Sequence, residues 1–553
     1  MRAVQVRLPI LLASLSLVIA GCATTGGADP NETDGETSES ASPAPDQPDE
    51  PDQPDQPDQP DQPDQLDRPE DVTTTTSDDD DGSATATSEP VDPETANRWE
   101  PGPIDWSELN SSVDIGRLAV PVDYDEPDGP QIELHLARRS ADDPDERIGS
   151  LLVNPGGPGF GGSDFAVFAG QIYDRELLER FDIVGFDPRG TGLSEPAIDC
   201  VDDLDPYVTG DVTPEDEAES AAIAETAREF ADACAANNPV LLEHVGTNNA
   251  ARDMDSIRRA LGEEQISYFG FSYGSELGGA WATLFPDTVR AAVLDGAADP
   301  NADSLESAKQ QLAGFEASLS TFLERCSGDE DCAFHNDGDA EGAYDALIAE
   351  LDERPVEADN DRPPVNQTVA ITATAQAMYS QSFWVQLEQA LAAAQAGDGT
   401  GLLRLHDTYF QRQPDGSFGN ELEAFQVISC ADTAERPTRE ELRADADELT
   451  AVGPRLSPEG SESYFCTFFR PAIDPRTDIT GDGAGPIVVI GITGDPATPF
   501  ESTARMANTL EDGRLVIVDA DQHTGYGVNR CVVDVVNRYL VDLEGPADET
   551  ECA

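Results

Sequence analysis

A serine between two glycines is the feature of this sequence that most directly suggests chemistry. The segment GFSYG places Ser272 between Gly270 and Gly274, after the apolar run 265–269 and before the helix-like run 275–284. A strand that turns sharply into a helix exposes the residue at the corner, and its neighbours two positions away must be small for the turn to close. The pattern favours Ser272 as a nucleophile, and a purely structural turn is the alternative.

A serine nucleophile needs a base, and the base needs a group that orients it. Of the five histidines, His523 lies in the glycine-containing loop DADQHTGYG, after the strand-like run 515–518. Asp495, in GITGDPATPF, follows the apolar run 486–490, and Asp295 at the end of another apolar run is its rival. We expect Ser272, Asp495 and His523 to form a catalytic triad, in the chain order typical of α/β-hydrolases.

A glycine-rich turn could supply the backbone N–H groups of an oxyanion hole. Residues 154–159 read NPGGPG and follow a short apolar run, so we expect the N–H groups of Gly157 and Tyr273 to bind the developing charge. The turn lacks the Lys-Ser/Thr ending of a phosphate-binding loop. Neither zinc spacing nor a calcium loop is present, so we expect no metal and no organic cofactor.

The elements around these residues indicate an α/β fold. Short apolar runs alternate with helical stretches from residue 113 to 297 and again from 486 onward, which predicts a mostly parallel sheet covered by helices on both faces. The opening runs, near 115–124 and 131–139, are expected to pair antiparallel. Residues 298–485 are rich in alanine and leucine and lack strand patterns. We therefore assign 100–297 and 486–553 to the core and 298–485 to a helical cap over the carboxyl ends of the strands.

The first 99 residues are expected to lie outside the fold. Residues 1–22 combine a basic start, an apolar run too short to span a membrane, and small residues before Cys22, which favours a lipoprotein signal with Cys22 acylated. An ordinary signal peptidase site is the alternative. Residues 23–99 contain tandem Pro-Asp-Gln repeats and acidic tracts, so we expect a disordered linker. The protein would be exported, and either lipid-anchored to the outer face of the cell membrane or secreted.

Charge and cysteine content agree with export. The net charge is 32 − 111 = −79, which excludes nucleic acid as a partner. Eight cysteines remain besides Cys22, and an even number in an exported chain suggests disulfides, most simply between neighbours in the sequence. The candidates are Cys200, Cys234, Cys326, Cys332, Cys430, Cys466, Cys531 and Cys552. We expect a monomer.

The motifs, taken in order, resemble a known family. NPGGPG, DPRGTG, GFSYG, LDGAADP, GDPATPF and DQHTGYG are similar to the α/β-hydrolase group of tripeptidyl aminopeptidases and proline iminopeptidases, most of all its actinobacterial lipoprotein branch. The resemblance implies an α/β-hydrolase fold, pairing of Cys430 with Cys466, and a serine exopeptidase that acts near free N-termini, whose amine is bound by cap carboxylates. NPGGPG stands where the iminopeptidase branch has HGGPG, which disfavours a strict proline iminopeptidase.

Two other functions remain open from the sequence. A carboxylesterase or lipase would use the same triad, and a binding protein could keep the fold without turnover. A peptidase would act on peptide substrates through an acyl-enzyme on Ser272, with His523 moving the protons.

Overall fold

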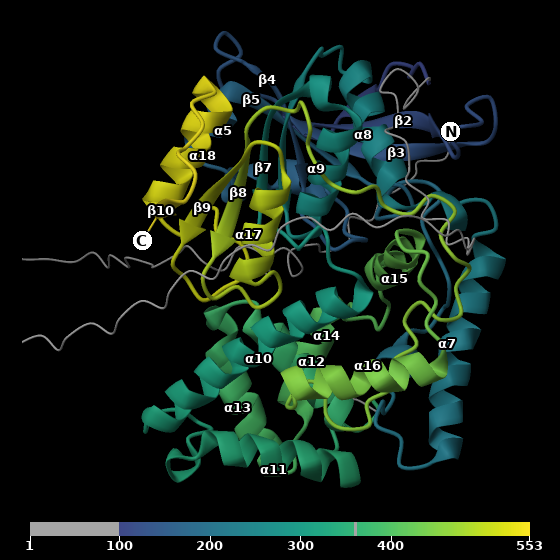
Figure 1. Cartoon of the computed structure of the whole chain (residues 1–553), viewed down its shortest axis with the longest axis vertical. Coiled ribbons are helices and arrows are strands. Elements are labelled where there is room, and N and C mark those ends of the chain that lie inside the picture. The colour runs from purple at the N-terminus through teal and green to yellow at the C-terminus, as the bar shows by residue number, and fades with distance from the viewer. Residues whose placement is uncertain (1–98, 359–361, 553) are drawn as a thin grey trace, which may run out of the picture. The chain divides into compact units, whose positions relative to one another are not determined.

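The structure, a computed structural model, describes residues 99–358 and 362–552 (Figure 1). The expectations for the leader, Cys22 and the linker up to residue 98 lie outside the described residues. The described strands are β1 (Asp105–Glu108), β2 (Val113–Pro121), β3 (Gln131–Arg139), β4 (Gly149–Asn154), β5 (Phe181–Asp187), β6 (Ile266–Phe271), β7 (Val289–Asp295), β8 (Ile487–Ile492), β9 (Gly513–Val518) and β10 (Thr550–Cys552).

Within the described residues these strands form one sheet in the order β1-β2-β3-β5-β4-β6-β7-β8-β9-β10. β1, β2, β3 and β5 pair antiparallel in turn, and from β5 through β4 to β10 every pairing is parallel. The expected antiparallel pair is β2 and β3. Since β6, β8 and β9 run parallel, the loops after them, which carry Ser272, Asp495 and His523, leave the sheet at the same edge.

Helices lie between the strands. Those of the core are α3 (Ser163–Val167), α4 (Ala169–Ile172), α5 (Arg175–Arg180), α6 (Asp205–Val208), α7 (Glu217–Asn237), α8 (Thr247–Ala260), α9 (Tyr273–Leu284), α17 (Phe500–Thr509) and α18 (Arg530–Asp542). Residues 163–180 form three short helices, because non-helical backbone at Phe168 separates α3 from α4 and extended backbone at Tyr173 and Asp174 separates α4 from α5. Asp174 then caps α5 by accepting a hydrogen bond from Glu176 N.

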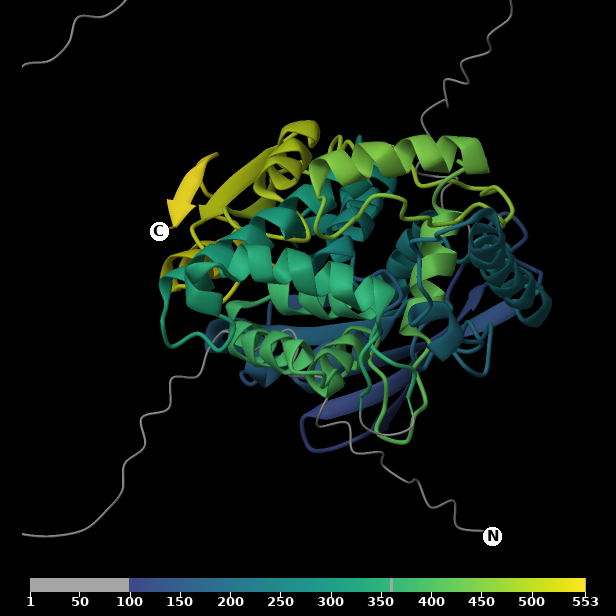
Figure 2. The same cartoon turned by 90° about the horizontal axis from the view of Figure 1, so that it is seen from below.

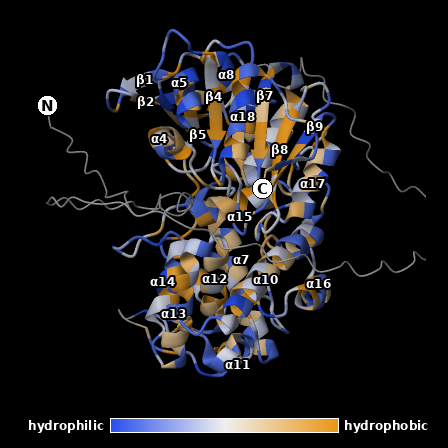
Figure 3. Cartoon of the chain, turned by 90° about the vertical axis from the view of Figure 1, so that its left-hand side faces the viewer, coloured by the Kyte–Doolittle hydropathy of each residue, from blue (hydrophilic) through white to orange (hydrophobic). Residues whose placement is uncertain are grey.

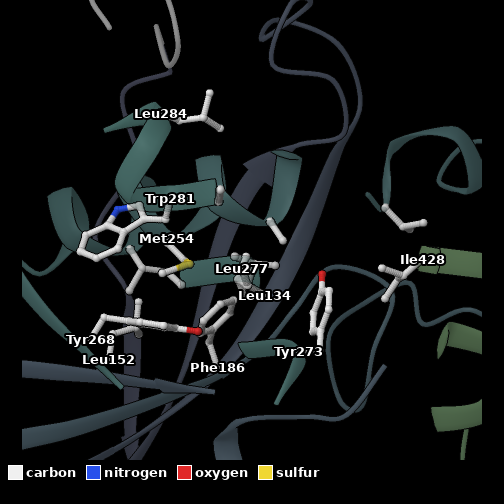
Figure 4. Packing of buried hydrophobic residues seen from close by; sticks show 14 of the residues in the cluster. Leu134, Leu152, Phe186, Met254, Tyr268, Tyr273, Leu277, Trp281, Leu284 and Ile428 are labelled. Carbon is white, nitrogen blue, oxygen red and sulfur yellow. The ribbon is translucent and has the colours of Figure 1, made fainter. Parts of the chain in front are cut away.

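Successive side chains of the strands enter two separate hydrophobic layers. Leu152 and Leu294 pack with α8 and α9 on one face, whereas Leu151 and Val293 pack with α5 and α18 on the other. Apolar side chains thus cover both faces, as a buried parallel sheet requires, and the central strands β4, β7 and β8 have the orange of hydrophobic residues in Figure 3. Figure 4 shows the first layer, where Met254, Tyr268 and Trp281 lie close together.

A helical segment follows β7, and we call residues 298–485 the cap. Its helices are α10 (Ser304–Gly328), α11 (Ala340–Glu353), α12 (Gln367–Met378), α13 (Trp384–Gln395), α14 (Thr400–Tyr409), α15 (Glu421–Ala431) and α16 (Arg439–Val452). They lie below the sheet in Figure 1 and in front of it in Figure 2. Helices α10 to α14 share a hydrophobic cluster of their own, whereas α15 packs into the layer beneath α8 and α9.

Four disulfides link the eight cysteines in sequence order. The pairs are Cys200–Cys234, Cys326–Cys332, Cys430–Cys466 and Cys531–Cys552. This agrees with the pairing of sequence neighbours and with the Cys430–Cys466 pair implied by the resemblance. Each closed loop restricts the unfolded chain and stabilises the fold by roughly 2–4 kcal/mol.

Among the described residues, no helix combines the length and the apolar character needed to cross a bilayer.

Candidate active site

Ser272 occupies a strained corner between β6 and α9. Its backbone has φ 54° and ψ −125°, a conformation that few residues other than glycine adopt and that is often retained at functional sites. A Cβ at Gly270 would lie 2.3 Å from Gly274 O, and one at Gly274 would lie 2.9 Å from Asn154 Oδ1. Both positions therefore require glycine, as the small residues two positions from Ser272 suggested.

His523 and Asp495 form a hydrogen-bonded pair. His523 Nδ1 lies 2.9 Å from Asp495 Oδ1 and 3.0 Å from Oδ2, and the Asp495 carboxylate is buried. This carboxylate also accepts hydrogen bonds from the N–H groups of Ala497 and Thr498 and from Thr498 Oγ1. Burial lowers the pKa of His523, but the charge of Asp495 and the hydrogen bond with it outweigh burial, so the pKa lies above its usual 6.5.

Asp295, the rival acid, connects the serine corner to the histidine loop. Its carbonyl oxygen accepts a hydrogen bond from Ser272 N at 2.8 Å, and its carboxylate accepts from Gly525 N and Tyr526 N, both at 2.7 Å. It makes no hydrogen bond with the imidazole of His523 among the described residues. Burial raises the pKa of Asp295 to about 7, although both N–H donors act in the opposite direction. Asp295 thus holds the two loops together while Asp495 contacts the imidazole.

The structure pairs His523 with Asp495, and Asp295 connects the His523 loop to the corner of Ser272. Gly296, next to Asp295, lies so close to Asp495 that a Cβ there would be 3.4 Å from Asp495 Oδ2. Within the described chain no hydrogen bond joins Ser272 Oγ to the imidazole. Such contacts are often long without substrate and tighten in the complex.

The NPGGPG turn lies directly against the serine corner. A Cβ at Gly156 would be 2.8 Å from Ser272 Cβ and 3.2 Å from Tyr273 N. Asn154 Oδ1 accepts a hydrogen bond from Gly156 N at 2.9 Å, which holds the turn in place. The N–H groups of Gly157 and Tyr273 donate to no protein acceptor in the part of the chain that the structure describes. Within the described residues, both N–H groups thus lack a protein acceptor, as the donors of an oxyanion hole must.

Several residues of the site were not expected from the sequence. Thr498 lies within the GDPATPF motif, and its hydroxyl is 3.1 Å from Asp495 Oδ2 and 3.4 Å from His523 Nδ1. Asn154 is part of NPGGPG, so motif position could have indicated both. Tyr379 of the cap, whose ring centroid lies 5.6 Å from that of His523, has no local signal because the contact spans more than a hundred residues.

Two acidic residues near the NPGGPG turn, Asp164 and Glu421, have carboxyl groups close enough to Asp187 to feel its charge. Asp164 lies in the first turn of α3, and Glu421 begins α15, with its carbonyl oxygen 2.5 Å from where a Cβ on Gly159 would lie. Burial raises the pKa of both carboxyls, and the charge of Asp187 raises them further. A cationic group bound next to these carboxyls would offset the cost of burying their negative charge.

One grouping of side chains in the described residues has spacing that could suit a metal: Cys326, Cys332 and Glu388. The two cysteines form a disulfide, so their sulfurs are not thiolate ligands.

A strained serine corner, a histidine–carboxylate pair and free N–H donors at the carboxyl edge of a parallel sheet together define a serine hydrolase. The chain belongs to the α/β-hydrolase fold family, whose sequence pattern matches residues 149–529.

Three curated relatives cover most of the chain. Serine protease Hip1 of Mycobacterium tuberculosis is 34% identical over 491 residues, covering 81% of this chain and 91% of that protein. Carboxylesterase B of the same species is 36% identical over 462 residues, covering 81% and 88%. Tripeptidyl aminopeptidase of Streptomyces coelicolor is 30% identical over 475 residues, covering 82% and 85%. The family relationship that the motifs suggested is thus confirmed.

Proposed function

We propose that this protein is a serine exopeptidase that hydrolyses peptide bonds near free N-termini, as a tripeptidyl aminopeptidase does. The observation that carries the proposal is the His523–Asp495 pair, joined through Asp295 to the strained corner of Ser272. Relatives named serine protease and tripeptidyl aminopeptidase support peptide substrates.

In the proposed reaction His523 takes the proton of Ser272 as the hydroxyl attacks the scissile carbonyl. The N–H groups of Gly157 and Tyr273 stabilise the oxyanion. His523 then gives the proton to the leaving amine, and the acyl chain remains on Ser272. Water, deprotonated by His523, hydrolyses this ester and restores the serine. Asp495 stabilises the imidazolium at each step.

The carboxyl groups beside the NPGGPG turn support a substrate that carries a free amine. An ammonium group placed between Asp164 and Glu421 would compensate for their partial burial. An ester of a neutral acid has no group that would do so.

Kinetics on matched substrates test this proposal. The kcat/KM for a tripeptide p-nitroanilide with a free amine should be at least about tenfold higher than that for its N-acetylated form. One charge-assisted hydrogen bond to the amine accounts for a factor of this size. Glu421→Gln should raise KM for the free amine and leave the acetylated substrate unchanged. Equal kcat/KM on both substrates would contradict an N-terminal exopeptidase.

A carboxylesterase is the second candidate, because the relative with 36% identity carries that name and the triad is the same. Short acyl p-nitrophenyl esters distinguish the two functions. The esterase is favoured if their kcat/KM exceeds that of every free-amine peptide substrate tested.

We also propose that the protein is exported and held by lipid on Cys22 at the outer face of the cell membrane, with secretion as the alternative, and that it is a monomer. The apolar leader and the four disulfides support export, since disulfides persist in oxidising compartments. Mass spectrometry of the N-terminal peptide of the native protein should find acylated Cys22. An unprocessed Met1 on the mature protein would contradict export. Light scattering of the purified protein tests whether it is a monomer in solution.

A further inference from the structure

The cap contacts the loop of His523 through the backbone and the aromatic ring of Tyr379. His523 N donates a hydrogen bond to Tyr379 O at 3.1 Å, and the neighbouring residues Ser380 and Gln522 form an antiparallel bridge. The ring of Tyr379 also meets the imidazole edge to face, with centroids 5.6 Å apart and planes at 73°. The cap therefore contacts both the main chain and the imidazole of His523.

A side-chain hydrogen bond extends this contact. Gln381 Nε2 donates to Asp521 Oδ2 at 2.8 Å, and Gln381 Oε1 accepts from Arg325 on α10. The Gln381 amide thus links a long cap helix to the histidine loop. Both Gln381 and Asp521 are exposed, so substitutions here do not disturb a hydrophobic core.

The core holds this loop only on either side of the histidine. Before it, Gly494 N donates to Ala520 O, and after it Thr524 N donates to Asp495 Oδ2 and Asp295 accepts from Gly525 and Tyr526. The imidazole of His523 bonds to Asp495 and Thr498. Among the described residues, all other hydrogen bonds that residues 521–523 make to other segments go to residues 379–381 of the cap.

We propose that Tyr379 and Gln381 are positioning residues for His523, so that the cap keeps the imidazole aligned between Asp495 and Ser272. This inference rests on the proposed function, in which His523 is the base. It follows that a cap shifted away from the sheet weakens the base as well as exposing the site. Proton transfer then depends on the docked cap.

Charge substitutions at Gln381 test this role. In Gln381→Glu the new carboxylate still accepts from Arg325 but repels Asp521. The double variant Gln381→Glu/Asp521→Asn restores a hydrogen bond with the polarity reversed, because the asparagine amide donates to the glutamate. Gln386→Glu adds the same charge at another exposed position, on α13, and is the matched control. Asp521→Ala removes the same hydrogen bond from the core side.

Three readouts are compared: kcat and KM on a tripeptide p-nitroanilide from pH 5 to 9, the rate of Ser272 phosphonylation, and the urea unfolding midpoint. Gln381→Glu should lower kcat and the rate of phosphonylation roughly tenfold and change KM little. This is the effect expected when the productive conformation loses one charge-assisted hydrogen bond. The acid-limb midpoint should move toward the usual pKa of histidine. The double variant should recover to within about threefold of wild type.

Wild-type kcat and pH midpoint in Gln381→Glu would overturn the proposal. An equal loss in Gln386→Glu, or no recovery in the double variant, would overturn it as well. If wild-type protein itself is not phosphonylated, it is the proposed serine chemistry that fails.

Discussion

Replacing Gly156 by alanine should separate catalysis from folding, because this glycine touches the serine corner. Its φ is +103°, and an added Cβ would lie 2.6 Å from Phe271 O and 2.8 Å from Ser272 Cβ. Gly397, in the cap, has a φ of +91° and no atom within 4 Å of the same position. Gly397→Ala is therefore a control that shares the backbone strain but not the contacts.

Backbone strain should change the free energy of unfolding by a similar amount in the two variants. A non-glycine residue in such a conformation costs about 1–3 kcal/mol, and the stiffer unfolded chain returns about 0.4–1 kcal/mol. Gly397→Ala should therefore lose about 1–2 kcal/mol of unfolding free energy, and Gly156→Ala should lose more, because its added Cβ also meets Phe271 O and Ser272 Cβ.

In Gly156→Ala the turn must also move away from Ser272, which takes Gly157 N–H out of line with the oxyanion. Loss of one such donor costs about 2.7–4 kcal/mol of transition-state stabilisation, or a 10²–10³-fold fall in kcat.

The assay is kcat and KM on a tripeptide p-nitroanilide, with urea unfolding of the same preparations. Gly156→Ala should lose kcat with KM within about threefold of wild type, since one donor acts mainly in the transition state. Gly397→Ala should keep wild-type kcat. If Gly156→Ala retains kcat within about threefold, the NPGGPG turn does not form the oxyanion hole.

Three further predictions concern charged groups. The acid limb of the kcat/KM profile should have its midpoint above pH 6.5, because the pKa of His523 is raised; Asp495→Asn should lower that midpoint and reduce kcat by roughly 10³–10⁴. The pKa of Asp295 is about 7 in the folded protein and about 3.9 in the unfolded chain. Its contribution to the free energy of unfolding is therefore complete below pH 4 and is lost as the pH rises through 7, by up to about 1.4 kcal/mol per pH unit. Asp295→Asn should flatten this slope in urea unfolding from pH 4 to 8, and an unchanged slope would contradict the assignment. The Arg189 guanidinium is fully buried against Asp253 at 2.8 and 2.6 Å, so Arg189→Met should cost about 3–5 kcal/mol in the same assay, and a loss below 1 kcal/mol would refute its role as the counter-ion.

Local patterns sufficed for the elements that place the site. The runs that became β4 to β9 are short and predominantly apolar, and such runs between helical stretches are typical of central parallel strands. β1 (DWSE) and β10 (TEC) were missed because they are short and polar, and they join the sheet at its edges. Their pairing depends on neighbours rather than on their own composition.

Some residues of the candidate site could also be predicted from local sequence patterns, and others could not. Ser272, Asp495 and His523 could be named because each follows an apolar run at the carboxyl edge, and motif order suggested how they converge. The structural role of Asp295 could not be read from its position, since its partners at residues 525 and 526 are distant in sequence. The same holds for Tyr379, which reaches His523 only through the packing of the cap on the sheet.

Peptide mapping after reaction with a fluorophosphonate tests the central claim most directly. The folded wild-type protein should gain one phosphonyl group, and the modified peptide should carry it on Ser272. The denatured protein and the Ser272→Ala variant should gain none. Modification of a different residue, or none in folded protein that unfolds cooperatively, would contradict the assignment of Ser272 as the nucleophile.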